Sequence, residues 1–199
     1  MKENSNWPRV NNFDSFPREF KQWEFYFVQI IERHKDNPEK SWLNWWNSCR
    51  VLKSYTVSSQ SELDKRIPLL KEYCKKYKAR CYIHPARRNN QSVAYDMIIM
   101  LWEYLKKNNH NLGRIFDSAC WHNSWVERLW IIDIDTKEYE PVQCIQTIIN
   151  EWAEWVWKEM NSYILPTLNW CHIITTPFDT RILSWVDIHK NNPTLLYFH

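Results

Sequence analysis

The chain has 199 residues, of which 44% are hydrophobic and 25% are charged, and its formal net charge is +3. This length and composition support a hydrophobic core in one large domain or two small ones, and they exclude an intrinsically disordered protein. The weak positive charge permits contact with nucleic acid but does not require it. We see no apolar run long enough for a membrane span and no signal-peptide pattern after Met1. We therefore expect a soluble, cytoplasmic protein that does not bind membranes.

The six cysteines are scattered and include no C-x-x-C pair. This pattern is typical of a protein from a reducing compartment, so we expect free thiols.

Glycine and tryptophan usage is abnormal, because the chain has one glycine, Gly113, and fourteen tryptophans. Ordinary usage is about 7% glycine. Several tryptophans stand where turns belong, as in Asn44-Trp45 and Asn169-Trp170, although glycine tolerates positive φ and tryptophan does not. UGA is read as tryptophan in some genetic codes and as glycine in others. We therefore hypothesise that many of these tryptophans stand for glycine; the alternative is a genuinely tryptophan-rich protein.

The first part of the chain predicts a β-α-β-α order. Residues 24–31 form a strand or a short helix, because the apolar run is too continuous for periodicity to decide. After a loop over residues 37–47, a β-rich run predicts a strand at 50–57. Ser59 and Glu62 then match a capping box for a helix of about four turns, which Pro68 should kink or start later. A strand at 79–84 and a helix from 92 to 107 follow, and Gly113 suits a helix C-terminus.

The second part of the chain predicts a β-α-β-β order and a terminal hairpin. We expect a polar connection at 115–128, a strand at 129–135, a helix at 141–151 and a turn or short helix at 178–184. Short strands are predicted at 163–165, 170–175, 185–188 and 194–198. The fold class is therefore α+β, with an N-terminal β-α-β-α module at 1–114 that carries basic residues and a second unit at 115–199. We expect the two to form one compact unit, because the whole chain has the length of one large domain.

Two aspartates stand out on the strand at 129–135. Side chains alternate along a strand, so Asp133 and Asp135 point to one face while Ile132 and Ile134 point to the other. Two carboxylates held close together repel unless a cation lies between them, and Mg²⁺ or Mn²⁺ is the usual occupant. The alternative is an edge strand with two solvated aspartates.

The sequence places His172 early in the later strand Cys171–Thr175 and Asp187 directly after Val186. The order D-x-D strand, x-His strand, hydrophobic-Asp strand resembles the archaeo-eukaryotic primase, or primase-polymerase, superfamily, which occurs in bacteriophages and plasmids as well as in cellular replication. The resemblance covers about residues 129–190. The superfamily pattern has a small residue where this chain has Trp170. Taken alone, His172 also fits a core histidine and Asp187 a surface acid.

The resemblance implies an RRM-like catalytic core in the C-terminal half and a metal-dependent nucleotidyltransferase that adds nucleotides on a nucleic-acid template. It implies that Asp133, Asp135 and Asp187 ligate Mg²⁺ or Mn²⁺ and that His172 contacts the phosphates of the incoming nucleoside triphosphate. It also implies a helicase or other replication proteins as partners. If the protein is phage-encoded, the resemblance implies that it acts in the host cytoplasm.

Basic residues offer further phosphate contacts. Arg87 and Arg88 follow a strand, lysines surround them in sequence, and Lys190 lies close to Asp187. Such groups can neutralise a nucleic-acid backbone or bind a triphosphate. For the lysines a solvated helix face is an equal alternative.

Three other functions fit parts of the sequence. Asp135-Thr136-Lys137 matches the D-x-K element of metal-dependent nucleases, with Asp117 as an upstream acid. A non-catalytic nucleic-acid-binding accessory protein also remains open. Cys120, His122, Cys171 and His172 are candidate zinc ligands, but their spacing differs from that of structural zinc sites.

Overall fold

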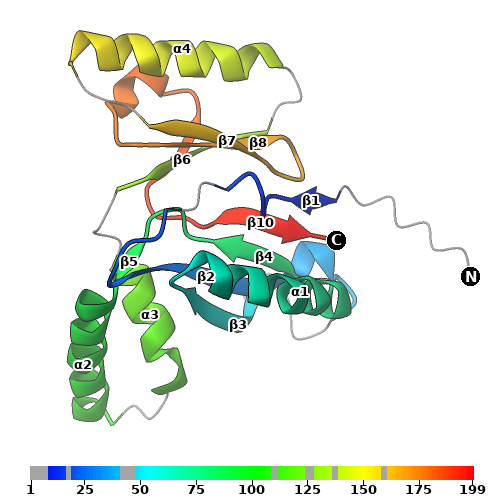
Figure 1. Cartoon of the computed structure of the whole chain (residues 1–199), viewed down its shortest axis with the longest axis vertical. Coiled ribbons are helices and arrows are strands. Elements are labelled where there is room, and N and C mark those ends of the chain that lie inside the picture. The colour runs from blue at the N-terminus through cyan, green and yellow to red at the C-terminus, as the bar shows by residue number, and fades with distance from the viewer. Residues whose placement is uncertain are drawn as a thin grey trace, which may run out of the picture.

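The computed structural model describes residues 9–16, 19–40, 48–108, 112–123, 128–135, 139–157 and 161–199. Over these ranges the chain forms four α-helices and two antiparallel sheets, so the predicted α+β class is confirmed. Figure 1 shows the two sheets one above the other, with α4 over the upper sheet and α1, α2 and α3 around the lower one. None of the described helices is both long and apolar enough to cross a membrane.

The first sheet is built around β2 (Glu24–Arg33). Its strand order is β1 (Val10–Asn11), β10 (Thr194–Phe198), β4 (Arg80–Ile83), β2 and β3 (Cys49–Val57), and β5 (Arg88–Asn89) pairs with the start of β2. The short 3-10 helix η1 (His34–Asp36) directly follows β2.

Both faces of β2 are buried, which explains why its apolar run has no period. Tyr26, Val28 and Ile30 join a core cluster with α1 (Gln60–Tyr77), whose buried residues include Leu63 and Leu70. On the opposite face, Phe25 and Phe27 pack with α2 (Asn90–Lys106) and α3 (Ile115–His122). A strand that is covered on both faces has a continuously hydrophobic sequence without alternation. The pairing of β2 with β3 and β4 is therefore what identifies it as a strand.

The cap predicted at Ser59 and Glu62 for the start of α1 is present, with the reciprocal bond shifted from the N-cap residue Ser59 to Ser58. The Ser59 hydroxyl accepts a hydrogen bond from the Glu62 backbone N–H at 3.2 Å, and the Glu62 carboxylate accepts one from the Ser58 N–H at 2.9 Å. Pro68 lies inside the helix. The helix therefore starts at the cap, and the alternative of a start after Pro68 is wrong.

The second sheet has the order β7 (Ser162–Pro166), β8 (Cys171–Thr175), β6 (Trp130–Ile134) and β9 (Asp187–His189). One face packs on α4 (Tyr139–Trp155) and on η3 (Thr180–Leu183), through residues that include Ile132 and Ile134. The opposite face contributes Ile131, Leu165 and Ile174 to the same core cluster as the first sheet. The two sheets therefore share a hydrophobic core, and one face of β6 lies toward the first sheet.

Three predictions about the second half and the preceding loop are wrong. Residues 115–122 form α3 instead of a polar connection, because Ile115, Ala119 and Cys120 are buried on one side of that helix. The last strand does not form a hairpin with β9; it crosses to the first sheet and pairs with β1 and β4. Gly113 lies in the short helix η2 (Leu112–Arg114), and Asn108 takes the positive φ that follows α2.

All six cysteines lie in the described ranges and all are free thiols, as predicted. Cys49 and Cys144 are exposed, and the other four are buried.

Two tryptophans have backbone conformations that favour glycine. Trp23 (φ 67°) lies in the turn closed by the hydrogen bond from the Glu24 N–H to the Lys21 carbonyl. Trp157 (φ 54°) follows the last turn of α4, where helices commonly end with glycine. Both side chains are exposed, so burial does not offset the strain of the left-handed region. This geometry supports the hypothesis that these positions are glycine.

We predict that Trp23→Gly and Trp157→Gly each raise the free energy of unfolding by about 1 kcal/mol, because each relieves a left-handed residue. Urea denaturation measures the change. The matched control is Trp155→Gly, since Trp155 is also exposed but is the last residue of α4 and has no positive φ; this substitution should not raise stability, because glycine is a poorer helix former than tryptophan. UGG codons at positions 23 and 157 in the coding DNA would refute the glycine hypothesis there.

Candidate functional site

Three of the predicted site residues form one row across the second sheet. Asp133 on β6 is the direct cross-strand partner of His172 on β8 and of Asp187 on β9. Directly paired residues point to the same face of a sheet, with Cα atoms about 5 Å apart. This is the face that carries Ile131 and Ile174 toward the first sheet, so the three polar side chains lie at the edge of the core shared by the two sheets.

Asp133 and His172 are in direct contact. His172 Nε2 lies 3.3 Å from Asp133 Oδ1, and His172 Nδ1 lies 2.9 Å from the hydroxyl oxygen of Thr194, a fully buried residue on β10. A neutral imidazole satisfies both contacts if it accepts from Thr194 and donates to Asp133. The hydrogen bond from His172 is the largest cause that lowers the pKa of Asp133; partial burial opposes it, and His189 and Lys35 add to the lowering.

Asp135 lies just beyond the end of β6, on the same side of the strand as Asp133. Its Oδ1 accepts a hydrogen bond from Asn169 Nδ2 at 3.0 Å. Asn169 belongs to the turn between β7 and β8, which is closed by a hydrogen bond from the Thr167 N–H to the Trp170 carbonyl at 2.9 Å. The turn therefore fixes one aspartate of the D-x-D pair.

A pocket of about 430 Å³ opens beside this row and is lined from both sheets. Asp133, His172 and His189 contribute from the second sheet, and Arg33 and Tyr82 from the first. Arg33 ends β2, and its Nη1 donates to the Tyr82 hydroxyl at 3.0 Å. The pocket thus has a carboxylate on one wall and a guanidinium on another, within the size range of small-molecule sites.

Lys35 adds a second positive charge from the first sheet. It lies on η1 and interacts electrostatically with Asp133 and with Asp135. Burial is the largest cause that lowers the pKa of Lys35; Arg33 and Arg80 lower it further, and Asp36 and Asp135 oppose them.

A buried ion pair fixes η1 in position. Arg80 Nε donates to Asp36 Oδ2 at 2.6 Å, and a second hydrogen bond joins the same two side chains. Both side chains are less than 10% exposed. A bidentate pair of this kind holds the backbone that carries Lys35 in a single orientation.

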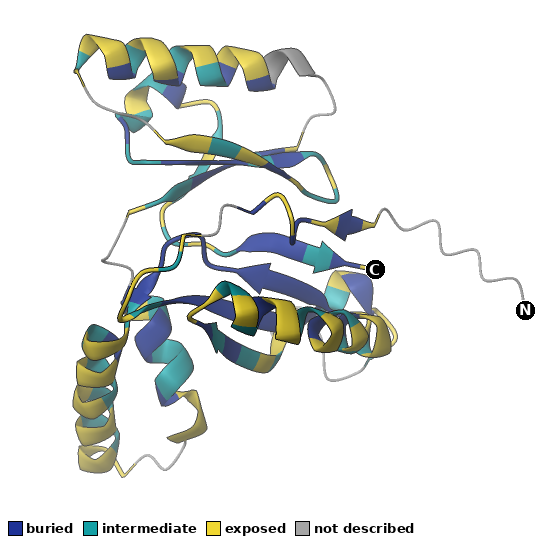
Figure 2. Cartoon of the chain, viewed as in Figure 1, coloured by how far each residue is buried: buried dark blue, intermediate teal, exposed yellow. Residues whose placement is uncertain are grey.

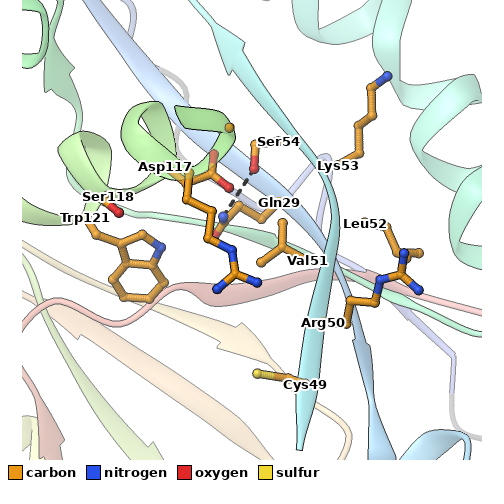
Figure 3. A pocket seen from close by; sticks show the side chains of 12 residues that line it. Gln29, Cys49, Arg50, Val51, Leu52, Lys53, Ser54, Asp117, Ser118 and Trp121 are labelled. Carbon is orange, nitrogen blue, oxygen red and sulfur yellow. Dashed lines mark hydrogen bonds between the residues drawn. The ribbon is translucent and has the colours of Figure 1, made fainter. Parts of the chain in front are cut away.

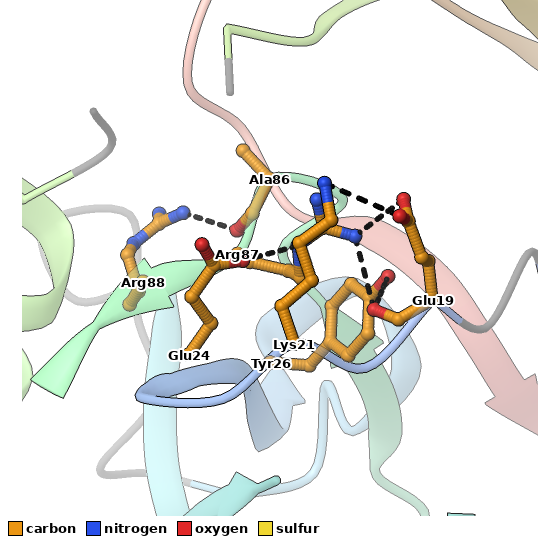
Figure 4. A network of polar contacts seen from close by, with 7 residues as sticks. All are labelled: Glu19, Lys21, Glu24, Tyr26, Ala86, Arg87 and Arg88. Carbon is orange, nitrogen blue, oxygen red and sulfur yellow. Dashed lines mark hydrogen bonds and ion pairs between the residues drawn. The ribbon is translucent and has the colours of Figure 1, made fainter. Parts of the chain in front are cut away.

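Arg87 contacts other protein groups (Figure 4). Its Nε donates to Glu24 at 2.7 Å, and its Nη1 donates to the carboxylate of Glu19 at 2.9 Å and to the Glu19 carbonyl at 3.0 Å. The side chain is buried. These contacts fix the segment before β2 against the turn before β5.

Arg88 is completely buried. Its guanidinium donates to the carbonyl oxygens of Cys120 (2.7 Å) and Ala86, donates to Asn191 Oδ1 at 3.2 Å, and lies 3.0 Å from His84 Nδ1. Burial lowers its pKa to about 10. Arg88 thereby joins α3 to the loop between β9 and β10, which carries Asn192 into the pocket. A direct role of Arg87 and Arg88 toward a substrate stays a prediction, and the contacts observed are structural.

Lys190 does not point into the pocket. Its ammonium lies over the ring of Trp130, 5.1 Å from the centroid. Trp130 packs on the α4 side of the second sheet, the face opposite to Asp133.

Within the described ranges, no three His, Cys, Asp or Glu side chains are close enough to hold a metal ion. The candidate zinc ligands do not converge either. Cys171 packs on the α4 side while its neighbour His172 faces the pocket, and burial raises the pKa of Cys120 to about 12 and of Cys171 to about 11. Raised thiol pKa values disfavour the thiolate that zinc requires.

Asp117 lies in a second pocket, of about 860 Å³, between α3 and β3 (Figure 3). Its pKa is raised by burial, and a hydrogen bond with Ser54 opposes that rise. Gln29 donates to the same Ser54 hydroxyl at 3.3 Å. Asp117 is therefore not grouped with Asp133, and Thr136 and Lys137 of the D-x-K element are outside the described residues.

Four residues around the site are not marked by any sequence motif: Arg33, Lys35, His189 and Thr194. Arg33 and Lys35 belong to the charged run Glu32–Asp36 at the end of β2, in which the charged residues follow no regular spacing. Only the pairing of β10 with β4 brings Thr194 to His172. The sequence did not show that the chain crosses from β9 in the second sheet to β10 in the first, and this crossing brings Thr194 to the site.

We predict that His172→Ala raises the pKa of Asp133, because it removes the hydrogen bond that is the main cause of the lowering. The ¹³C chemical shift of the Asp133 carboxylate, followed against pH, measures this. A lowered pKa in the folded state stabilises the fold above the unfolded value of about 3.9, and that contribution is lost as the pH falls through the folded pKa. His122→Ala on α3 is the control; an Asp133 titration that stays unchanged in His172→Ala contradicts the contact.

We predict that Asp36→Ala lowers the free energy of unfolding by about 3–5 kcal/mol, because it leaves the buried Arg80 charge without its partner. Chemical denaturation measures the loss. Glu39→Ala is the matched control, since it removes an exposed carboxylate paired with Lys78 at 3.4 Å and should leave stability nearly unchanged. Equal effects of the two substitutions would show that the Asp36 pair does not hold η1.

Comparison of the chain with protein-family models, with curated proteins and with solved structures finds no match. A functional proposal for this chain therefore rests on the arrangement of Asp133, Asp135, His172 and Asp187 and on the charges around the pocket.

Proposed function

We propose that the chain is a metal-dependent nucleotidyltransferase, similar to a primase-polymerase, that adds nucleotides on a nucleic-acid template. The observation that supports this most is the row formed by His172, Asp133 and Asp187 beside a pocket whose other wall carries Arg33. We further propose that β6, α4, β7 and β8 form an RRM-like core. Their order, β-α-β-β, and the position of α4 on one face of the sheet agree with that arrangement.

The residues present suit a hard divalent cation. Asp133, Asp135 and Asp187 offer carboxylate oxygens, the ligands that Mg²⁺ and Mn²⁺ prefer. Asp187 is exposed and lies directly across from Asp133. Its side chain is therefore free to rotate toward Asp133, as a shared metal site requires. The bound metal would supply charge neutralisation at the triphosphate and a lower pKa for the attacking hydroxyl.

Each remaining polar group at the site has a role that its contacts suggest. His172, hydrogen-bonded between Thr194 and Asp133, orients the Asp133 carboxylate and presents an imidazole beside the pocket. Arg33 supplies positive charge from the first-sheet side of the pocket, and Lys35 on η1 adds a charge that interacts with Asp133 and Asp135, where a triphosphate needs it. Arg33 belongs to the first sheet, whereas Asp133 and Asp187 belong to the second. A nucleotide bound between the two sheets would therefore contact the guanidinium and the carboxylates.

No observation favours the nuclease alternative to the same degree. Its upstream acid, Asp117, is bonded to Ser54 in the second pocket, whereas His172 and Asp187 are paired with Asp133 and would have no role in that reaction. The non-catalytic alternative predicts template binding without turnover.

We predict that Asp133→Asn and Asp135→Asn each reduce Mg²⁺- or Mn²⁺-dependent nucleotide addition by about 10³-fold or more, because each removes charge that holds the metal. The assay follows extension of a labelled strand on a single-stranded template with all four nucleoside triphosphates. Asp64→Asn, at a carboxylate bonded to Gln60 on α1, is the control and should extend normally.

Wild-type extension by either aspartate variant would remove that residue from the site. Cleavage of the template by the unmodified protein, with no extension, would instead establish a nuclease, and unchanged template binding without either activity would establish an accessory protein.

A further inference from the structure

Helix α2 exposes a continuous apolar surface that no described part of the chain covers. Figure 2 shows α2 exposed along most of its length, where it projects from the sheets beside α3. We define the α2 outer face as the large apolar side chains Tyr95, Ile98, Ile99, Trp102 and Leu105. Each is between 52% and 64% exposed. Contiguous apolar surface of this kind on a folded chain usually marks an interaction site.

These five residues form one stripe. At about 100° per residue they fall within roughly 120° of the helix circumference. The opposite side of α2 is the one that packs inward, through Val93, Met97 and Met100 against α3 and β2. The α2 outer face is therefore not needed for the chain's own core, and its apolar character requires another explanation.

The chemistry of the α2 outer face favours protein over nucleic acid. The cation beside it is Lys106, whose ammonium lies over the ring of Trp102, 5.1 Å from the centroid, and is also 3.7 Å from Glu103 Oε1. Nucleic-acid binding depends on cations that neutralise phosphates, and a lysine already paired with a carboxylate supplies little of that charge. The acidic residues of α2 lie to the sides: Asp96 accepts a hydrogen bond from Asn123 of the chain's own α3 segment, and Glu103 pairs with Lys106 and Lys107.

The stripe is self-complementary when reversed. An antiparallel pairing centred between Ile98 and Ile99 puts Ile98 against Ile99 of a second copy and Tyr95 against its Trp102. The same centre puts Gln91, at the start of the helix, against Lys106 at its end. A two-fold interface requires this reciprocal relation, in which a residue meets a different residue and the reverse contact follows by symmetry.

We propose that two copies of this chain associate through antiparallel packing of their α2 outer faces. The five side chains expose roughly 600 Å² of mainly apolar surface on each copy. A standard interface buries about 800 Å² per partner, so polar residues at the rim, with Gln91 and Lys106 at the two ends, account for the remainder. Trp102 lies mid-helix without a positive φ, so the glycine argument made for Trp23 and Trp157 does not extend to it.

The experiment measures the mass of the full-length chain in solution by sedimentation equilibrium at about 50 µM, above the dissociation constant of an ordinary specific interface. The expected wild-type mass is twice the 24.6 kDa of one chain. Ile98→Glu combined with Ile99→Glu should halve that mass, because it places four carboxylates in the centre of the interface. Since both side chains are exposed, circular dichroism should show an unchanged fold.

The matched control is Trp155→Glu, which places a charge on an exposed apolar position of α4 and should leave the mass at two chains. A wild-type mass of one chain would overturn the proposal, and so would a two-chain mass that the α2 double variant does not change. Both readouts are independent of nucleotide addition.

Disulfide trapping tests the antiparallel register. In a background with the exposed Cys49 and Cys144 replaced by Ser, Tyr95→Cys/Trp102→Cys should give covalent two-chain species on mild oxidation. Seven residues on one helix separate the two positions by about 10 Å, which excludes a bond within one chain. Tyr95→Cys alone should remain a single chain. Trapping by Tyr95→Cys alone would indicate a parallel pairing, and no trapping by the double variant would overturn the antiparallel one.

Discussion

Burial of β2 on both faces is the constraint on which the rest of the structure depends. Its residues pack alternately against α1 and against α2 and α3, so each of these helices is positioned by a different set of side chains on one strand. The strand also pairs with β3, β4 and β5. Its last residue, Arg33, is followed directly by η1, which carries Lys35. The ion pair between Asp36 of η1 and Arg80 of β4 attaches η1 to the first sheet. The positive side of the candidate site is therefore a continuation of a strand that is buried on both faces.

The negative side of the site depends on the core shared by the two sheets. Ile131, Leu165 and Ile174 make one face of the second sheet hydrophobic, and the polar row of His172, Asp133 and Asp187 follows one step along the same face. A carboxylate at the edge of such a core pays a desolvation cost unless it is paired. Asp133 has His172 and the charge of Lys35 as partners, and Asp135 has Asn169. The partial burial that makes the Asp133 carboxylate costly also lowers the dielectric around it, which strengthens its interaction with any bound cation.

The sequence was informative where local periodicity or capping controls the structure. The capping interaction of α1, the strands β3, β4, β6 and β8, and the common side of Asp133 and Asp135 follow from side-chain type and spacing, since alternation along a strand is a local property. The row that His172 and Asp187 form with Asp133 depends on strand pairing, and only the resemblance grouped these residues beforehand. Properties that depend on distant pairing were missed. The short α3 has too few residues for a clear period, and the crossing of β10 to the first sheet separates Thr194 from β9, its neighbour in sequence. Arg87 and Arg88 looked like surface cations because their partners, Glu19 and Cys120, lie 68 and 32 residues away.

Trp170 connects the abnormal composition to the site itself. The turn that holds Asn169 against Asp135 uses the backbone N–H and carbonyl of Trp170, in hydrogen bonds to Thr167. The indole does not contribute to those bonds, and its Nε1 is buried without a hydrogen-bond partner among the described residues. An unpaired buried donor costs about 1–3 kcal/mol. A glycine at position 170 would keep every backbone contact of the turn and remove that cost, although it would lose the packing of the indole against the α4-side core cluster. The same position is where the primase-polymerase pattern has a small residue, so the glycine hypothesis and the proposed function agree at this residue.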